Sequence, residues 1–404
     1  MKSLRVNRYG LSVCVAAAML AGCAAGSSTS LNPSSVRPSA ERTRPSVTYG
    51  VLYSFAGSGE GDGEIPEATL VNVGGTLYGT TIEGGSNDDG TVFSIAPSGT
   101  ETVLHSFGGS GDGAYPEAGL LNVNGTLYGT TMEGGANIYG TVFSITPSGK
   151  EKVLHGFGAS GDGQYPVAGL INVNGTLYGT AADGGADGSG IVFSLTPAGA
   201  ETVLYSFKGG SADGENPSAG LVNVSGTLYG TTYEGGANAD GTAFSITPAG
   251  KEKVLHSFVG GPGDGKYPVA DLVDVNGKLY GTTEEGGPFC RASHYCGTAF
   301  AITTSGKFSL LHSFGSGADG GFPYAGLLNV NGKLYGTTAD GGARSAGTIF
   351  SMTPSGKEKV LHAFGDSGDG AYPEAGLLNV KDTLYGTTSG AGANNHGTVF
   401  SLDL

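Results

Sequence analysis

The sequence predicts an all-β fold, a closed seven-bladed β-propeller built from four-stranded antiparallel blades. The first supporting observation is composition, since 77 of 404 residues are glycine and none is tryptophan. The second is a repeat, because the tetrapeptide Leu-Tyr-Gly-Thr occurs seven times, with its tyrosine at Tyr78, Tyr128, Tyr178, Tyr229, Tyr280, Tyr335 and Tyr385. The third is that each end of the repeated region lacks a strand that the other end supplies.

Two other kinds of glycine-rich chain, collagen and disordered segments, do not fit this sequence. A collagen helix needs glycine at every third position, and no such period occurs. A disordered chain is poor in aromatic residues, whereas 17 Phe and 19 Tyr recur here at regular intervals. The formal net charge of −15 also argues against a nucleic-acid partner, because phosphate backbones are bound by basic surfaces.

Each repeat contains signals for four short strands. In the second copy the strands are expected at residues 119–123, 126–131, 141–145 and 152–157. Asn124-Gly125 joins the first two, and this dipeptide is the strongest signal for a two-residue hairpin. Apolar residues occupy both faces of the strands, as expected for a small sheet that lies between two neighbouring sheets. Four such antiparallel strands describe one propeller blade.

The two ends of the repeated region predict how the ring closes. Residues 51–55 are a fourth strand without a blade of its own, and residues 398–402 are a third strand with nothing after it. If the N-terminal strand completes the last blade, the ring closes without an open edge. An open solenoid would leave both ends uncapped. We therefore assign residues 49–404 to one closed propeller.

The repeated motifs also carry a family resemblance. Leu-Tyr-Gly-Thr-Thr, Gly-Thr-Val-Phe and Val-Leu-His-Ser-Phe, at this period, resemble the GloVer tandem repeat of bacterial exported proteins over all of residues 51–404. The resemblance implies a β-propeller with a variable surface anchor, and it implies no established reaction or ligand. The sequence departs from the pattern at Gly390-Ala391-Gly392, where other copies have an acidic residue before Gly-Gly.

The N-terminal segment is predicted to be an export signal. Basic residues precede an apolar run at residues 11–20, which is too short to span a bilayer of about 30 Å. The following Leu20-Ala21-Gly22-Cys23 resembles the lipobox of bacterial lipoproteins. This resemblance implies that residues 1–22 are removed and that Cys23 is the site of lipid attachment. The alternative is an ordinary secretory signal with an incidental cysteine.

Residues 23–48 are rich in Ser and Pro and are predicted to be a tether between the lipid and the propeller. Two or three acyl chains anchor a protein stably. By the rule of the lipoprotein family, Ala24 in place of an aspartate after the cysteine implies the outer membrane. We therefore expect an exported protein, lipid-anchored to that membrane and either periplasmic or surface-exposed.

Two cysteines remain in the propeller region, Cys290 and Cys296. They lie inside the longest repeat, whose tyrosines Tyr280 and Tyr335 are 55 residues apart instead of 50 or 51. Exported proteins form disulfides, so we expect a Cys290–Cys296 disulfide that staples this insertion. A metal-binding pair is the alternative.

Blade topology assigns the connecting loops to two faces. With strands ordered from the axis outward, the 1–2 and 3–4 hairpins share one face, here called the hairpin face. The 2–3 and 4–1 loops share the other, the loop face, and by fold-level analogy the face with longer loops holds the ligand site. Ten of the twelve lysines in residues 51–404 fall at hairpins, whereas acidic residues recur in the loops. We expect the hairpin face to look toward an anionic membrane and the acidic loop face to meet a glycan or protein.

Every 4–1 loop carries an aspartate before a glycine: Asp62, Asp112, Asp162, Asp213, Asp264, Asp319 and Asp369. As metal ligands these carboxylates are candidates for Ca²⁺, which takes six to eight oxygen atoms. As structural residues each would cap its own loop. We favour the structural interpretation, because every blade needs a turn and not every blade needs a binding site. No copy has the D-x-D-x-D-G calcium signature, and no other cofactor is expected.

Histidines occupy one recurring position in the fourth strand, at His105, His155, His256, His312 and His362, and Tyr53 and Tyr205 fill the same position elsewhere. A position that accepts either ring is expected to serve packing. Residues that the repeat does not dictate are better candidates for a ligand site, and in the loops these are Tyr139, Arg291, His294, Tyr295, Arg344 and His396. Such side chains stack on and hydrogen-bond to sugars or peptides. Ordinary loop variation is the alternative.

No catalytic motif accompanies the repeats. The sequence has no G-x-S-x-G elbow, H-E-x-x-H pair or phosphate-binding loop, and acids repeated around a ring provide no pair with two different environments. We therefore expect a monomeric, non-catalytic binding or adhesion module of the cell envelope for a glycan, peptide or protein. The alternatives are a propeller enzyme acting on polysaccharide, as a glycoside hydrolase or lyase, and a scaffold in an envelope protein complex.

Overall fold

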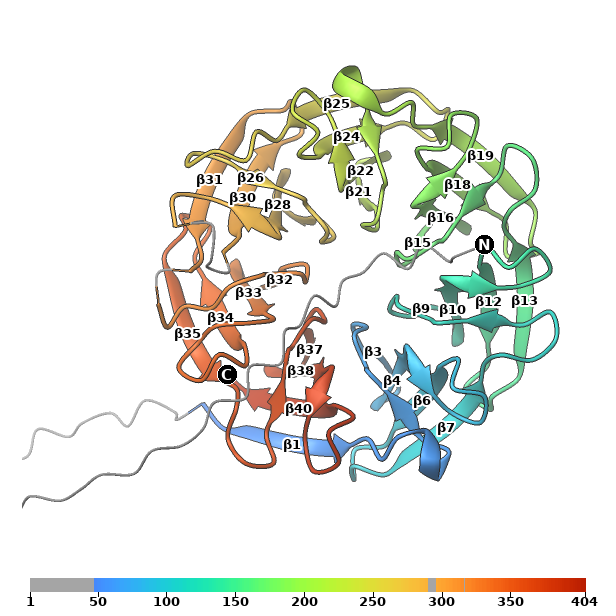
Figure 1. The fold of residues 1–404 in the computed structure, drawn as a ribbon, viewed down its shortest axis with the longest axis vertical. Helices are drawn as coiled ribbons and strands as arrows, with labels where there is room; N and C mark the ends of the chain where they lie inside the picture. Colours follow the sequence, from blue (N-terminus) through green and yellow to red (C-terminus); the bar gives the residue numbers. More distant parts are fainter. Residues whose placement is uncertain (1–46, 290–295, 316) are drawn as a thin grey trace, which may run out of the picture. The chain divides into compact units, whose positions relative to one another are not determined.

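The computed structural model describes residues 47–289, 296–315 and 317–404, and they form a ring of seven four-stranded antiparallel sheets (Figure 1). This confirms the predicted seven-bladed β-propeller. The described ranges hold no α-helix and two short 3-10 helices, η1 (Ser58–Glu60) and η2 (Gly210–Ala212). Neither has the length and apolarity of a membrane span, and no other helix was found in those ranges.

Within each blade the strands follow one another from the axis outward. Blade 1 consists of β3 (Val71–Val73), β4 (Thr76–Thr81), β6 (Thr91–Ile95) and β7 (Glu101–Ser106). Blade 2 consists of β9 (Leu121–Val123), β10 (Thr126–Thr131), β12 (Thr141–Ile145) and β13 (Glu151–Gly156). Blade 3 consists of β15 (Ile171–Val173), β16 (Thr176–Ala181), β18 (Ile191–Leu195) and β19 (Glu201–Ser206). Blade 4 consists of β21 (Val222–Val224), β22 (Thr227–Thr232), β24 (Thr242–Ile246) and β25 (Glu252–Ser257).

The remaining three blades repeat this order. Blade 5 consists of β27 (Val273–Val275), β28 (Lys278–Thr283), β30 (Thr298–Thr303) and β31 (Phe308–Ser313). Blade 6 consists of β32 (Leu328–Val330), β33 (Lys333–Thr338), β34 (Thr348–Met352) and β35 (Glu358–Ala363). Blade 7 consists of β37 (Leu378–Val380), β38 (Thr383–Thr388), β40 (Thr398–Asp403) and β1 (Tyr49–Ser54).

Blade 7 is completed by the N-terminal strand, as predicted. β1 pairs antiparallel with β40, and the register runs from Tyr49 opposite Leu402 to Ser54 opposite Thr398. Figure 1 shows β1 as the outermost strand beside β40, so the first and last strands of the propeller lie side by side. β40 is the third strand of blade 7, so its C-terminal end lies on the hairpin face, where the third strands of other blades turn into their 3–4 hairpins. Tyr49, the first residue of β1, is paired with this end, at Leu402. The chain therefore enters the propeller on the hairpin face.

The 4–1 and 2–3 loops of a blade share one face, because they pair with each other. Six blades form a two-stranded ladder from these loops: β2 (Gly63–Glu64) with β5 (Glu83–Gly84), β8 (Gly113–Ala114) with β11 (Glu133–Gly134), β14 (Gly163–Gln164) with β17 (Asp183–Gly184), β20 (Gly214–Glu215) with β23 (Glu234–Gly235), β26 (Gly265–Lys266) with β29 (Glu285–Gly286), and β36 (Gly370–Ala371) with β39 (Gly390–Ala391). In blade 6 a single bridge joins Gly321 to Asp340. The predicted loop face is thereby confirmed.

Phenylalanine rings fill the space between blades. Phe107 follows the outer strand of blade 1, Phe143 lies in the third strand of blade 2, and their ring centroids are 5.1 Å apart. Both are fully buried, and burial of each such ring stabilises the fold by about 1.5–3 kcal/mol. Gly129 of Leu-Tyr-Gly-Thr leaves room for this ring, since a Cβ there would lie 2.5 Å from Phe143 Cζ. Six further pairs repeat the contact: Phe55–Phe93, Phe157–Phe193, Phe207–Phe244, Phe258–Phe300, Phe314–Phe350 and Phe364–Phe400.

Candidate functional site

The aspartate of each 4–1 loop closes that loop. Asp112 Oδ1 accepts the N–H of Gly113 at 2.7 Å, and its Oδ2 lies 2.9 Å from Nε2 of His105 in the preceding outer strand. The same pairing occurs at His155–Asp162, His256–Asp264, His312–Asp319 and His362–Asp369, and a tyrosine hydroxyl donates instead at Tyr53–Asp62 and Tyr205–Asp213. The geometry therefore shows a loop-closing role for these carboxylates. It differs from an ordinary Asx-turn because it ties the loop to a strand.

A glutamate in the next outer strand approaches five of these seven pairs, a contact that was not predicted from the sequence. One carboxylate oxygen of Glu151, Nε2 of His105 and one oxygen of Asp112 all lie within 4.8 Å of one another. Burial, and then the charge of Asp112, raise the pKa of Glu151 to about 7. The pKa of Glu101, Glu201 and Glu252 is likewise raised to about 7, by burial first and a loop aspartate second.

Aromatic side chains replace this glutamate in two blades. Phe308 of blade 5 stacks on His256 of blade 4, with ring centroids 4.2 Å apart. Tyr49 of blade 7 stacks on His362 of blade 6 at 3.9 Å. Each contact spans two blades. The glutamate position is thus a repeated interblade contact, and the signal for it in the sequence was its recurrence before Val-Leu-His.

Three of the predicted ligand residues lie in the described chain, and each contacts the 4–1 loop that leaves its own blade. The Tyr139 ring packs edge-on against Tyr165 at 5.6 Å between centroids. Arg344 forms an ion pair with Asp366. Nδ1 of His396 lies 3.1 Å from a carboxylate oxygen of Glu64. These residues belong to blades 2, 6 and 7, so the structure distributes them around the loop face and does not bring them together.

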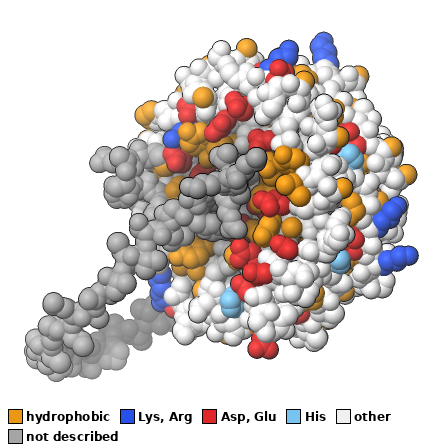
Figure 2. Space-filling view, turned by 45° about the vertical axis from the view of Figure 1, so that its right-hand side comes forward, with side chains coloured by type: hydrophobic (Ala, Val, Ile, Leu, Met, Phe, Trp, Pro, Cys, Tyr) orange, Lys and Arg blue, Asp and Glu red, His pale blue; other side chains and the backbone are white. Residues whose placement is uncertain are grey.

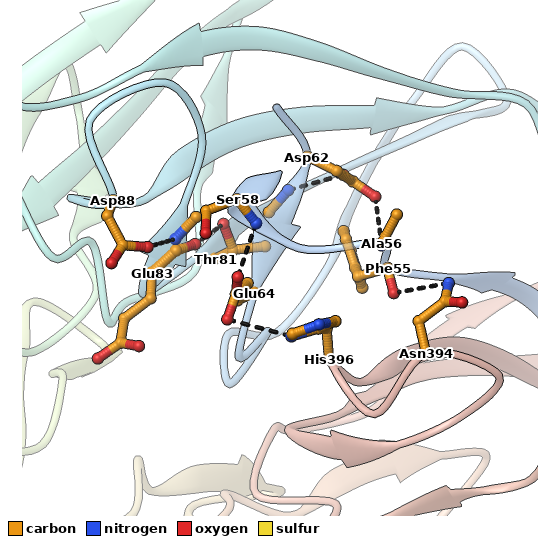
Figure 3. A network of polar contacts seen from close by, with 12 residues as sticks. Phe55, Ala56, Ser58, Asp62, Glu64, Thr81, Glu83, Asp88, Asn394 and His396 are labelled. Atoms are coloured by element: carbon orange, nitrogen blue, oxygen red, sulfur yellow. Dashed lines mark hydrogen bonds and ion pairs between the residues drawn. The ribbon is translucent and has the colours of Figure 1, made fainter. Parts of the chain in front are cut away.

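The His396 contact is part of the junction between blades 7 and 1 (Figure 3). Glu64 also accepts the N–H of Ser58 at 2.6 Å, which lowers the pKa of its carboxyl against the effect of burial. On the same junction the Asn394 side-chain amide donates to the carbonyl oxygen of Phe55 at 3.1 Å. His396 therefore links the 2–3 loop of blade 7 to the loop that follows β1, and a role toward a ligand stays a prediction.

Several predicted residues lie outside the described ranges. Arg291, His294 and Tyr295 do so, as do Cys290 and the lipid-attachment residue Cys23. Cys296 is described and is 1% exposed. The Cys290–Cys296 disulfide and the ligand-binding role of the other three residues stay predictions.

A cavity lies on the axis of the propeller. It has a volume of about 250 Å³ and is lined by Thr69, Leu70, Val71, Gly119, Leu120, Leu121, Gly169, Leu170, Ile171 and Asp271. Nine of these residues precede or begin the innermost strands of blades 1 to 3, and the tenth, Asp271, comes from blade 5. Each innermost strand begins after a 4–1 loop, on the loop face, and ends at a 1–2 hairpin, on the hairpin face. The cavity is lined by the beginnings of these strands, so this axial pocket lies toward the loop face.

Asp271 breaks the repeat at the axis. The equivalent positions are glycine in five blades, at Gly119, Gly169, Gly220, Gly326 and Gly376, and Thr69 in blade 1. The Asp271 side chain presents surface to the central channel, and its Oδ1 accepts the N–H of Gly220 at 2.6 Å. Although the side chain is exposed to the channel, the protein atoms around it reduce its hydration, which raises the pKa of its carboxyl, while the Gly220 N–H opposes the rise.

Charge is distributed unevenly over the molecular surface. Figure 2 shows acidic and hydrophobic side chains interspersed toward the middle of the face in view, with most Lys and Arg side chains toward its edge. Three of the described acidic residues of the loop ladders, Asp183, Glu234 and Glu285, come from adjacent blades. Burial raises the pKa of Asp183 and Glu234, and neighbouring carboxylates add to the rise. Asp183 and Glu234 therefore lie in a region of negative charge on the loop face.

A closed ring of seven matched repeats defines a tandem-repeat β-propeller. The Gloeobacter/Verrucomicrobia repeat matches residues 40–186 and 171–400, and the chain belongs to this family. The resemblance inferred from the motifs is thereby confirmed. No curated protein sequence matches the chain.

Comparison with solved structures finds distant similarities. A puromycin-hydrolysing peptidase of Mycobacterium tuberculosis shares 10% sequence identity with a TM-score of 0.52, over 88% of this chain and 54% of the peptidase. A periplasmic gluconolactonase of Pseudomonas aeruginosa shares 14% identity with a TM-score of 0.46, over 78% of this chain and 92% of the lactonase. The chain thus spans about half the length of the peptidase. The likeness to the peptidase shows the propeller fold alone.

Proposed function

We propose that this protein is a lipid-anchored, non-catalytic binding module of the bacterial cell envelope, which holds a group of a glycan or peptide ligand in the axial pocket. The observation that carries the proposal is Asp271. It places one carboxylate beside a cavity whose equivalent ring positions are otherwise glycine or threonine. A residue that every blade needs for its structure is expected in every repeat. A carboxylate that occurs at this position in only one blade needs a different explanation.

The pocket supports binding more than hydrolysis. Acid–base cleavage of a glycosidic bond uses two carboxyl groups in different environments, and Asp271 is the only titratable side chain among the residues that line the cavity. Each of the seven loop aspartates, by contrast, hydrogen-bonds to the His or Tyr of the outer strand that precedes its loop. A cavity with apolar walls and one polar anchor is typical of a site that orients a small ligand.

The envelope location rests on the lipobox-like Cys23 and on where the chain enters the fold. Because β1 starts at the hairpin face, a tether that ends at residue 48 delivers the propeller with its lysine-bearing hairpins toward the membrane. Anionic lipid headgroups attract such lysines. The loop face then looks away from the membrane, where a ligand can reach the axial pocket.

A combined glycan and peptide array tests the function. The mature protein is compared with Asp271→Gly, which introduces the residue of five other repeats, and with Asp274→Asn as a control. We expect wild type and control to retain a ligand that Asp271→Gly loses. Retention of no glycan and no peptide by the wild-type protein would contradict the binding function.

A further inference from the structure

We propose that the axial pocket recognises a primary ammonium group on a short apolar stem, with the carboxylate of Asp271 as its counter-ion. The inference rests on the binding function proposed above and names the chemistry of the group that is bound. It is carried by the single charge in the pocket, the apolar walls around that charge and the size of the cavity.

The charge in the pocket has no opposite charge within it. Asp271 is the only charged residue among the ten that line the cavity. Its Oδ1 accepts the Gly220 N–H, and among the described residues no donor is bonded to its Oδ2. The side chain is exposed to the channel, but the apolar walls beside it reduce its hydration, so the charged form is less stable there than in bulk water. A ligand that brings a positive charge with N–H donors satisfies Oδ2 and removes this cost, so the pocket selects for a cation.

The walls of the pocket fit a short hydrocarbon stem. Leu70, Leu120 and Leu170 are each at most 6% exposed and form equivalent parts of the wall in blades 1, 2 and 3. The volume of about 250 Å³ is just below the roughly 300–1,000 Å³ of pockets for drug-sized ligands. A single alkylammonium side chain or one sugar ring has a suitable size.

The same lining does not suit a metal ion. Ca²⁺ takes six to eight oxygen ligands, whereas the side chains of the lining supply one carboxylate, from Asp271, and one hydroxyl, from Thr69. An ammonium group needs only three acceptors. Asp271 and Thr69 are exposed to the channel, and water in the channel can serve as a further acceptor.

The test compares two probes of similar shape on the complete mature protein. n-Butylammonium and n-butanol differ in charge at one end, and ligand-observed NMR at neutral pH measures the dissociation constant of each. We expect n-butylammonium to bind about tenfold more tightly or better, as one charge-assisted hydrogen bond predicts. Equal affinity for the two probes overturns the inference.

Two substitutions and a matched control locate the effect. Asp271→Asn keeps the shape of the side chain, and Asp271→Gly introduces a residue that five blades already accommodate. Asp274→Asn also removes one negative charge from blade 5 and introduces the residue of the other six repeats, but position 274 caps the 1–2 hairpin by accepting the N–H of Gly277. We expect both Asp271 variants to lose the preference and Asp274→Asn to keep it. A preference that persists in both Asp271 variants overturns the inference.

Lysine side chains and amino sugars are two sources of the same group. Nα-acetyl-lysine amide and glucosamine are therefore titrated separately, and weaker binding of either probe to Asp271→Asn supports the inference and identifies the source. Binding of neither probe overturns it. A glycan or peptide retained equally by wild type and Asp271→Gly leaves the binding function in place and overturns this inference alone.

Discussion

Tyr49 stacks on His362 with the two rings 3.9 Å apart and inclined by only 3°. Tyr49 opens the strand that closes blade 7, and His362 belongs to the outer strand of blade 6. The closing strand is therefore held by its own sheet and by the neighbouring blade. Tyr49 also contacts Phe364 and Phe400, each at 5.7 Å between ring centroids.

Replacement of Tyr49 should weaken the closure of the ring. Tyr49→Ala removes three ring contacts, and we expect a loss of about 3 kcal/mol in the free energy of unfolding and a fall of roughly 5 °C in Tm. Tyr49→Phe keeps the rings and should lose much less. Thermal unfolding followed by circular dichroism measures both, and equal Tm values for the two variants would contradict the proposed role of the stack.

The buried glutamates predict how stability depends on pH. The folded pKa of Glu151 is about 7 and its ordinary value is 4.5, so the folded state binds more protons between these values. The contribution of Glu151 to the free energy of unfolding is therefore complete below pH 4.5 and is lost as the pH rises through about 7.

Glu151→Gln should remove this dependence. A pKa shift of this size corresponds to roughly 3 kcal/mol in the free energy of unfolding. Because water screens a half-exposed side chain, we expect the substitution to raise the free energy of unfolding by only about 1 kcal/mol at pH 8. At pH 4.5 the variant should match the wild type. Urea unfolding at both pH values measures the difference, with Glu60→Gln in the exposed η1 helix as control. A gain of the same size at both pH values would show that ionisation is not its cause.

Removal of calcium should leave the propeller unchanged. The loop aspartates already bond to a ring side chain, and in Asp112 both oxygens are engaged, with Gly113 and His105. We expect EDTA to change Tm by less than about 1 °C, within the spread of such measurements. A fall of several degrees that Ca²⁺ reverses would instead identify these carboxylates as ligands.

The orientation on the membrane can be tested by labelling. Cysteines introduced at Tyr139 on the loop face and at Lys359 on the hairpin side of blade 6 are exposed to a membrane-impermeant thiol reagent, with the protein anchored in isolated outer membranes. We expect faster labelling at position 139, because position 359 lies toward the lipid. The protein without an introduced cysteine reports labelling of its native thiols. Faster labelling at position 359 would reverse the proposed orientation.

The blades and the ring closure could be predicted because both depend on local patterns. Asn124-Gly125 marks its hairpin directly, and the two incomplete ends of the repeated region complement each other. The first strand of blade 2 begins at Leu121 and not at residue 119. Its pairing with β10 ends at Leu121, opposite Tyr128, so Gly119 and Leu120 precede the strand.

The contacts between blades could not be predicted in the same way. Glu151 lies close to His105 because the outer strands of neighbouring blades meet around the ring. The period of the repeats gives the number of blades, but it does not show which side chains of adjacent blades come into contact. Tyr139 and His396 look irregular in sequence, yet both occupy the position before the glycine of Gly-Thr-Val-Phe. In the structure that position packs against the 4–1 loop, and the side chains there vary with the loop they meet. Comparison of the repeats in the sequence is enough to show that Asp271 departs from the glycine of most copies. Its place in the lining of the axial pocket follows only from the three-dimensional arrangement of the inner strands.

The first strand of the described chain, β1, is also the strand that completes blade 7. Proteolytic cleavage ahead of Tyr49 would separate an intact ring from the N-terminal segment, with its cavity and loop face unaltered. Cleavage within β1 would leave blade 7 one strand short and expose the backbone of β40. The few residues that separate these two cutting sites thus decide whether a protease leaves the propeller intact or removes its closing strand.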